Sequence, residues 1–307
     1  MAIGRLRLKP LSYDFPPWRP PNEANSLLLR VTRGCTWNRC TFCSMYKHFT
    51  FERRPLEEVK TDILTAASLY RAEVRTVFIG DSNSPAIKTA DFVDILRELY
   101  ASFPAIERVT SYARAKTLLK KPLDELKQLR QAGLTRLHVG LETGNAELLK
   151  KIKKGATPDE MVAGCRRAKD AGFELSLYVL LGLGGEALSE AHALDTAVAL
   201  NRIDPHFIRV RTLQPQPGSE VYGAMAEGTF IKCSHKTVLR EQRILVENLN
   251  VNSQYLSDHI TNYIPVNGKL PGDKEAMLRT IDEHDVDLAN NGLLQSRFAR
   301  KDTLQSL

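Results

Sequence analysis

Six short stretches of apolar and β-branched residues recur along the chain, each bounded by glycine, proline or polar residues. They occupy residues 26–32, 75–79, 106–112, 136–141, 174–181 and 206–213. Runs of this length and composition are typical of strands buried in a parallel sheet. The residues between them have helical periodicity, so the pattern predicts strands and helices in alternation.

The predicted helices begin at recognisable residues. Pro55 and Pro122 each stand in a first turn with acidic residues directly behind them, as is favoured at helix amino termini. Thr157 precedes Glu160 by three residues, which is the spacing of a capping box. These signals support the assignment of helices between the strands.

Strand followed by helix, repeated along the chain, implies a parallel sheet with right-handed crossovers. We predict an α/β fold, a partial (β/α)6 TIM-type barrel with its working face at the carboxyl ends of the strands. An open doubly wound sheet is the alternative. We expect residues 1–225 to form the core barrel with an amino-terminal lead-in, and residues 226–307 to form a mainly helical C-terminal extension packed on it.

Composition narrows the class of protein. Of the 307 residues, 43% are hydrophobic and 26% are charged, as in an ordinary folded domain rather than a disordered chain. No run approaches the roughly 18 apolar residues of a membrane span. The first residues lack the apolar stretch of a secretory signal, so we expect a cytoplasmic location and no membrane contact.

The net charge of +7 is unevenly distributed. Much of the excess lies in residues 107–154, including lysines at 150, 151, 153 and 154. Glu147 precedes Lys151 by four residues, the favoured order for a helical ion pair. We interpret this cluster as a solvated helix face; contact with nucleic acid is possible but not favoured.

Three of the five cysteines lie within nine residues, as Cys35, Cys40 and Cys43 in a C-x4-C-x2-C pattern. Clustered thiolates suit zinc or an iron–sulfur cluster. Cys165 falls at a helical core position and is predicted to be buried.

Three interpretations of the cysteines are open. A structural zinc site needs a fourth ligand, which His48, Cys233 or His235 would supply. The spacing is also that of a plant-type ferredoxin, which needs a fourth cysteine. In the third interpretation, three thiolates hold a [4Fe–4S] cluster and leave one iron open to a small molecule.

Polar residues and glycines follow successive predicted strands, at the edge where the cysteines also lie. They are Gly80-Asp81-Ser82, Ser111 with Arg114, Glu142, and the turn 182–186 that contains Gly182, Gly184 and Glu186. A barrel does not need such residues at its strand ends for stability, so the pattern indicates a site.

In the order and spacing of these motifs, residues 24–225 resemble the radical S-adenosylmethionine (radical SAM) superfamily. Phe42, directly before the last cysteine, matches the aromatic residue of that family. Gly80-Asp81-Ser82 falls where the family has a Gly-Gly-Glu type turn, and Glu142 and residues 182–186 fall where other SAM contacts occur. The usual spacing is C-x3-C-x2-C, so this chain has one extra residue in its cysteine loop.

The resemblance implies that Cys35, Cys40 and Cys43 bind three irons of a [4Fe–4S] cluster and that SAM chelates the fourth. Reductive cleavage of SAM then gives a 5′-deoxyadenosyl radical that abstracts hydrogen from a substrate. The expected cofactor-binding residues are Phe42, Gly80, Asp81, Ser82, Ser111, Arg114, Glu142, Gly182, Gly184 and Glu186. The catalytic residues are not predicted.

We expect an enzyme that acts on a small anionic molecule, because Arg209 and Arg211 lie on the last predicted strand. A reducing electron donor such as flavodoxin or ferredoxin is an expected partner. The polar segment 257–263 is predicted to close the barrel. The competing hypothesis is a non-catalytic binding or electron-transfer module, stabilised by zinc or an iron–sulfur cluster, for an acidic partner.

Overall fold

A large curved sheet of eight strands, accompanied by a small sheet of two strands, runs through the computed structural model, which describes residues 18–290. The eight strands, in spatial order, are β1 (Leu27–Arg30), β4 (Thr76–Gly80), β5 (Arg108–Ala113), β6 (Leu134–Glu142), β7 (Glu174–Leu181), β8 (Phe207–Thr212), β9 (Gln254–Leu256) and β10 (Asn267–Lys269). All neighbours are parallel except β9 and β10. The six predicted strands are confirmed, and the sheet has the open, partial-barrel form.

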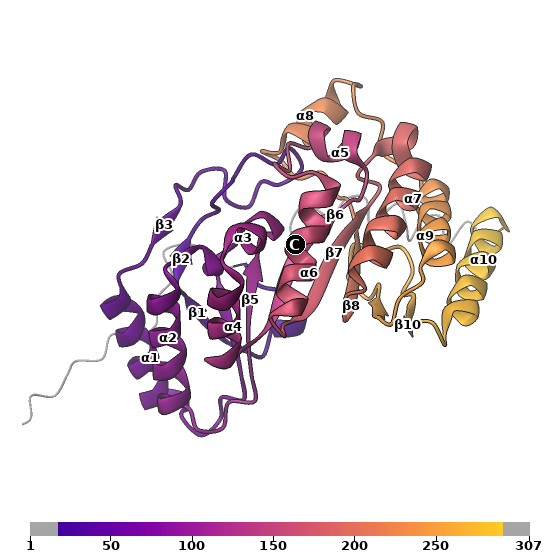
Figure 1. Ribbon diagram of the computed structural model, residues 1–307. Coiled ribbons are helices and arrows are strands. Elements are labelled where there is room, and N and C mark those ends of the chain that lie inside the picture. The colour runs from indigo at the N-terminus through magenta and orange to yellow at the C-terminus, as the bar shows by residue number, and fades with distance from the viewer. Residues whose placement is uncertain (1–17, 291–307) are drawn as a thin grey trace, which may run out of the picture.

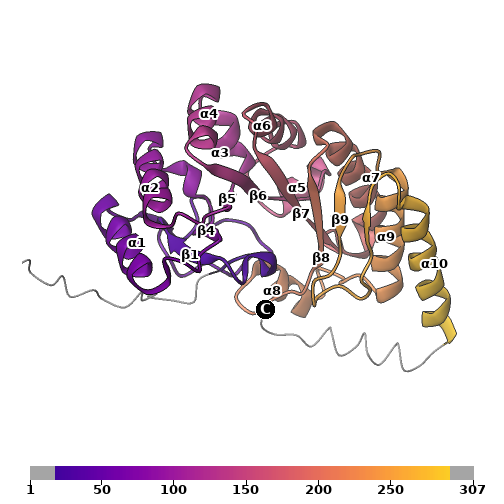
Figure 2. The ribbon, with the colours of Figure 1, turned by 90° about the horizontal axis from the view of Figure 1, so that it is seen from below.

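Helices cover the convex side of this sheet and leave its inner face open (Figures 1 and 2). The helices of the described residues are α1 (Leu56–Tyr70), α2 (Thr89–Ser102), α3 (Ala115–Lys120), α4 (Leu123–Gln131), α5 (Ala146–Lys151), α6 (Pro158–Asp170), α7 (Gly185–Ile203), α8 (Glu220–Ala226), α9 (His235–Asn248) and α10 (Lys274–Asn290), and there are short 3-10 turns η1 (Pro21–Glu23) and η2 (Ser84–Ala86). The short helices α5 and α8 lie at the carboxyl end of the strands (Figure 1).

The helices form where the sequence supplies both a cap and an apolar stripe. At the start of α6, the Thr157 hydroxyl accepts from the Glu160 N–H, and the Glu160 carboxylate accepts from the Thr157 N–H. The predicted capping box is therefore confirmed. In α2, Phe92, Leu96 and Leu99 are fully buried, since positions at i, i+4 and i+7 share one helix face.

The segment after residue 226 is mainly helical, and it adds strands that the sequence analysis did not predict. It contains α9 and α10, but also β9 and β10, which continue the sheet beyond β8. These strands have three residues each, too few for an alternating pattern to be recognised. The predicted boundary at residue 225 falls inside α8 and stays a prediction.

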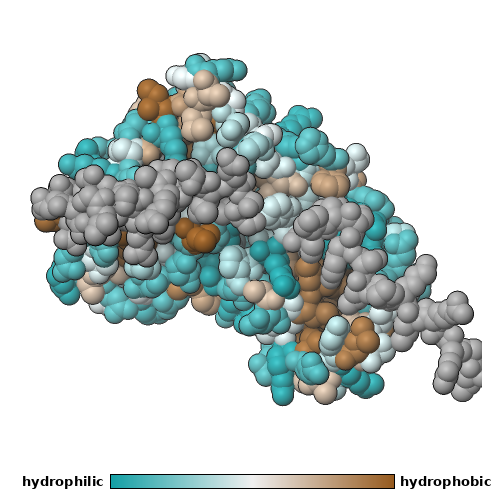
Figure 3. All heavy atoms as spheres, turned by 180° about the vertical axis from the view of Figure 1, so that it is seen from behind, coloured by the Kyte–Doolittle hydropathy of each residue, from teal (hydrophilic) through white to brown (hydrophobic). Residues whose placement is uncertain are grey.

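On the face seen in Figure 3, opposite to that of Figure 1, the coloured surface is mostly hydrophilic with separate apolar patches. Among the described residues, no helix combines the length and the apolar character that a membrane span requires. Apolar surface of this scattered kind is normal for a folded protein.

Candidate cofactor and substrate site

The cysteine loop follows β2 (Thr32–Arg33) and returns through β3 (Glu52–Arg53), which pairs with β2. Cys35, Cys40 and Cys43 are all partly exposed and unbridged. The three thiols are close enough that the charges of Cys35 and Cys40 contribute to the raised pKa of Cys43. Between residues 18 and 286, no three His, Cys, Asp or Glu side chains converge on a position for a single metal ion.

The start of the loop is anchored to the end of β4 through Gly34. The Gly34 N–H donates to Asp81 Oδ2 at 2.9 Å, and the Ser82 hydroxyl donates to the Gly34 carbonyl at 2.9 Å. Gly34 has a φ of 77°, a conformation that glycine adopts without steric cost. The strand-end residues predicted from the sequence therefore lie against the residue that precedes Cys35.

Asp81 is the partner of a buried arginine. Arg30 Nε lies 3.1 Å from Asp81 Oδ1, and Arg30 Nη2 lies 2.9 Å from Asp81 Oδ2. The two side chains are 3% and 1% exposed. The Gly80 carbonyl accepts from the Val31 N–H and the Ser84 hydroxyl. The predicted SAM contacts of Gly80, Asp81 and Ser82 stay predictions, since these groups have protein partners.

Asn83 is a functional candidate that the sequence analysis missed. It is fully buried, and its amide nitrogen donates to Thr36 in the cysteine loop at 3.0 Å and to Thr117 in α3 at 2.8 Å. Its amide oxygen accepts from the Arg114 N–H at 3.0 Å. Asn83 thus joins the ends of β4 and β5 to the loop. Its place directly after the strand-end motif was the available signal.

Trp37 fastens the middle of the loop to the segment after α5. Its indole N–H donates to the Lys153 carbonyl at 2.7 Å, and the Arg114 guanidinium lies 5.1 Å from its ring centroid. A Cβ on Gly155 would approach the indole to 2.3 Å. Only glycine fits beneath this ring, so the loop and the 153–155 segment are matched in shape.

Lys154 lies beside the cysteines rather than on the solvated face assigned to its cluster, so that interpretation is wrong for this residue. Its Nζ bonds Glu142 Oε1 at 2.9 Å, and each side chain is 14% exposed. Glu142 has a φ of 64°, and its carboxylate occupies the position that a Cβ on Gly140 would need, 2.1 Å away. Lys154 Nζ also lies 5.8 Å from the Phe42 ring centroid.

The electrostatics of this cluster suit thiolate ligands. Burial raises the pKa of Cys40 and raises that of Cys43 to about 11, while Lys154 opposes the rise at both. Burial lowers the pKa of Arg114, and the charges of Cys35 and Cys40 oppose that change. A metal binds the thiolate form, and the adjacent cations would favour it. The donor set and its surroundings therefore fit an iron–sulfur cluster.

The turn after β7 faces the C-terminal segment. The Gly182 N–H donates to Glu241 Oε1 at 2.7 Å, and Glu186 Oε1 accepts from the Ser234 N–H at 2.6 Å. Both bonds connect the turn to α9 or its cap. The SAM-binding roles predicted for Gly182 and Glu186 therefore stay predictions.

Two other predicted residues are engaged within the fold. The Ser111 hydroxyl is buried and donates to the Ile79 carbonyl at 2.9 Å. Gly184 precedes α7, and a Cβ there would approach Leu188 to 2.9 Å. These observations do not test the SAM contacts predicted for Ser111 and Gly184, which stay predictions.

Aromatic side chains cover the inner face of the sheet. The ring centroids of Phe78 and Tyr112 are 5.1 Å apart, and those of His138 and Tyr178 are 6.1 Å apart. Below them, Glu23 in η1 bonds His138 at 3.2 Å. The four rings of this floor come from four neighbouring strands, β4, β5, β6 and β7.

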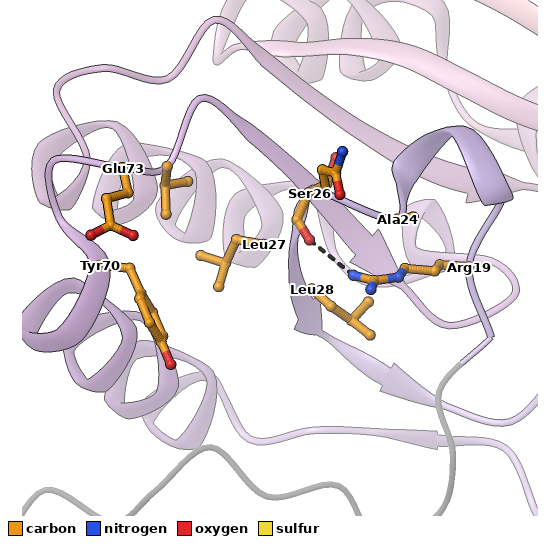
Figure 4. A pocket seen from close by; sticks show the side chains of 9 residues that line it. Arg19, Ala24, Ser26, Leu27, Leu28, Tyr70 and Glu73 are labelled. Atoms are coloured by element: carbon orange, nitrogen blue, oxygen red, sulfur yellow. Dashed lines mark hydrogen bonds between the residues drawn. The ribbon is translucent and has the colours of Figure 1, made fainter.

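A cavity of about 560 Å³ lies around the start of β1, at the opposite end of this strand from the cysteine loop (Figure 4). Arg19, whose guanidinium donates to the Ser26 carbonyl at 3.0 Å, lines it together with Tyr70 and Glu73. None of the predicted site residues lines this cavity, so we do not assign the cofactor to it.

Similar proteins are known for part of this chain. A heme chaperone HemW from Bacillus subtilis is 25% identical over 62% of this chain and 51% of that protein. A GTP 3′,8-cyclase from Listeria monocytogenes is 31% identical over 50% of this chain and 44% of that protein. The chain spans about half the length of these curated relatives.

Solved structures support the fold. Methylornithine synthase (PylB) superposes with a TM-score of 0.53 at 18% identity, over 83% of this chain and 68% of that protein. The family model described as "Radical SAM superfamily" matches residues 29–197. Members of that superfamily use a [4Fe–4S] cluster and S-adenosylmethionine, which favours the open-cluster interpretation over the zinc and ferredoxin alternatives. With the match extending from β1 into α7, this chain belongs to the radical SAM superfamily.

Proposed function

We propose that this protein is a radical SAM enzyme acting on a small anionic substrate. When bound, a reduced [4Fe–4S] cluster would supply the electron for cleavage of SAM to methionine and a 5′-deoxyadenosyl radical, the species that would take a hydrogen atom from the substrate. The observation that carries the proposal is the placement of three thiols beside Lys154, Arg114 and the strand ends.

Cys35, Cys40 and Cys43 would hold the cluster. Asp81 and Asn83 would position their loop, because they bond Gly34 and Thr36 from the end of β4. These two are positioning residues, since their polar groups are directed at the protein itself.

Arg114 and Glu142 are the residues best placed to contact SAM. Arg114 keeps donor capacity beyond its bond to the Lys154 carbonyl, and a guanidinium suits a carboxylate such as that of methionine. Glu142 has carboxylate capacity beyond its bond to Lys154, which suits an ammonium group or ribose hydroxyls. Phe42 would offer an apolar edge.

The partners follow from the same chemistry. An enzyme of this class needs a one-electron reductant, for which a flavodoxin or ferredoxin is suited, and we propose that it works in the cytoplasm. Arg209 and Arg211 lie on β8, the strand next to β7 in the sheet, which supports a negatively charged substrate.

The test uses protein purified anaerobically and reconstituted with iron and sulfide. We expect an EPR signal of a reduced [4Fe–4S] cluster that changes when SAM is added, together with formation of 5′-deoxyadenosine. An EPR spectrum that does not change when SAM is added would contradict the proposal. Tightly bound zinc in place of the cluster would also contradict it.

A second candidate is a binding protein that carries the cluster without turnover. It is favoured by the similarity to HemW, which is named a heme chaperone. This alternative predicts a SAM-responsive cluster that forms no 5′-deoxyadenosine under any substrate tested. The same assay therefore separates the two functions.

A further inference from the structure

The inner face of β8 carries two arginines. Arg209 and Arg211 alternate with Ile208 and Val210, which are buried on the helix-covered side. Since side chains alternate along a strand, both guanidinium groups lie on the side of the aromatic floor. Their spacing of two residues corresponds to roughly 7 Å along the strand.

The two guanidinium groups differ in the contacts that they make with the rest of the protein. Arg209 Nε donates to the Ser176 hydroxyl at 3.1 Å. The Arg211 guanidinium lies 4.8 Å from the centroid of the Tyr178 ring, and within residues 18–286 it has no hydrogen bond or ion pair. A guanidinium offers five N–H donors in a planar fork, so this partly buried group is prepared to receive an anion.

Two carboxylates near this floor are already engaged, and a third, Asp258, adds negative charge close to Arg209 and His259. Glu142 is bound to Lys154 at 2.9 Å, and Glu23 is bound to His138 at 3.2 Å. Burial, reinforced by the charge of Arg211, lowers the pKa of His259 to about 4. His259 is therefore neutral near pH 7, and the positive charge at this place belongs to the arginines.

Tyr112 connects the arginine to the cofactor side. Burial raises its pKa, Arg211 opposes the rise and Glu142 adds to it, so Tyr112 lies within electrostatic reach of both. Glu142 is bound to Lys154, whose charge acts on Cys40. A molecule lying across Tyr112 would thus reach from Arg211 toward the cysteine loop.

The C-terminal segment forms the outer boundary of this place. The Asn262 amide donates to the Val210 carbonyl at 2.7 Å, and Thr212 bonds both Thr261 and Asn262. These contacts hold residues 257–263 along β8, with His259 next to Arg211.

We propose that Arg211 anchors an oxyanion subsite, where it binds the carboxylate or phosphate of a small molecule whose apolar body lies against Tyr112 and Tyr178. The inference rests on the proposed function, because it specifies the substrate class of that same site. Arg209 adds positive charge, and the stacking of Arg211 on Tyr178 leaves the edge of its fork open for two-pronged binding.

The test measures binding of simple probes, so it needs neither turnover nor the true substrate. Benzoate and phenyl phosphate are titrated at constant ionic strength and followed by ligand-observed NMR, with benzyl alcohol as the neutral match. We expect at least one of the two anions to bind at least tenfold more tightly than benzyl alcohol. Their relative affinities tell a carboxylate site from a phosphate site.

Two variants test the role of Arg211, and a third serves as the control. Arg211→Gln is expected to lose at least tenfold in anion affinity. The affinity of Arg211→Lys is expected to lie between those of the unaltered protein and Arg211→Gln. Arg240→Gln removes an exposed arginine that pairs with Glu190 on the outer surface and is expected to bind like the unaltered protein. Equal binding of benzyl alcohol and both anions, or no loss in either Arg211 variant, would overturn the proposal.

Iron content and 5′-deoxyadenosine are measured on the same samples of unaltered protein. Anion binding with no SAM cleavage would refute the proposed enzyme while leaving the subsite standing. SAM cleavage without Arg211-dependent anion binding would refute the subsite and support the proposed enzyme.

Discussion

The ends of β4 and β7 carry similar residues and use them differently. At β4, Asp81 and Ser82 bond Gly34 and so hold the cysteine loop. At β7, Gly182 and Glu186 bond Glu241 and Ser234 at α9. A glycine with an acidic residue at a strand end therefore does not by itself indicate a cofactor contact. The segment that packs against the turn decides its use.

The largest effect is expected from the loop that β4 holds. Replacing Cys35, Cys40 or Cys43 by alanine should abolish the cluster absorbance and the formation of 5′-deoxyadenosine, because each thiolate would bind one iron. Cys165→Ala is the control, since that thiol is buried in the core. Retention of a full cluster in any loop variant would contradict the assignment.

The next largest effect is expected at Asp81, which anchors the cysteine loop through Gly34. Asp81→Asn removes the negative charge from a buried ion pair with Arg30, and breaking such a pair typically costs about 3–5 kcal/mol. We expect the free energy of unfolding, measured with urea, to fall by about that amount. The exposed pair of Arg33 and Glu52 offers the matched control Glu52→Gln, which should change it by less than about 1 kcal/mol. Equal stability losses would mean that the buried pair is no anchor.

At the end of β7, the expected effect is instead on the pH dependence of the free energy of unfolding. Burial raises the pKa of Glu241 from 4.5 to about 7, so the folded state keeps a proton that the unfolded chain releases. This contribution to stability is complete below about pH 4.5 and is lost as the pH rises to about 7, amounting to roughly 3 kcal/mol. Glu241→Gln should remove that dependence.

The comparison is made between unfolding curves of Glu241→Gln and the unaltered protein at several pH values. His192 and Cys233 lie near Glu241 as well, and subtracting the two curves removes their separate contributions. Glu190→Gln, at an exposed pair between α7 and α9, should keep the pH dependence of the unaltered protein. A constant difference across this pH range would contradict the role of Glu241.

The smallest effect is expected on the exposed face of α5. Lys151 and Glu147 form the ion pair anticipated from their spacing, at 2.7 Å. Since both side chains are more than half exposed, Glu147→Gln should lower the unfolding free energy by no more than about 0.5 kcal/mol. A loss comparable to that of Asp81→Asn would mean that surface charge matters as much as the buried anchor.

The strands of the core could be predicted because each is long enough to show a continuous apolar run. The cysteines could be recognised because their spacing is local. By contrast, the bond of Trp37 to Lys153 joins residues 116 positions apart, and no local pattern records it. The same applies to Lys154, whose neighbours along the chain are exposed lysines but whose partner is Glu142.

The position of β9 has a consequence for solubility. It pairs with β8, while the outermost strand, β10, is three residues long and ends in an exposed lysine. Short, charged edge strands discourage pairing with other molecules. A fragment ending near residue 225 would present β8 as a bare six-residue edge, and we expect copies of it to aggregate through that edge. The segment beyond residue 226 thus protects the sheet from self-association.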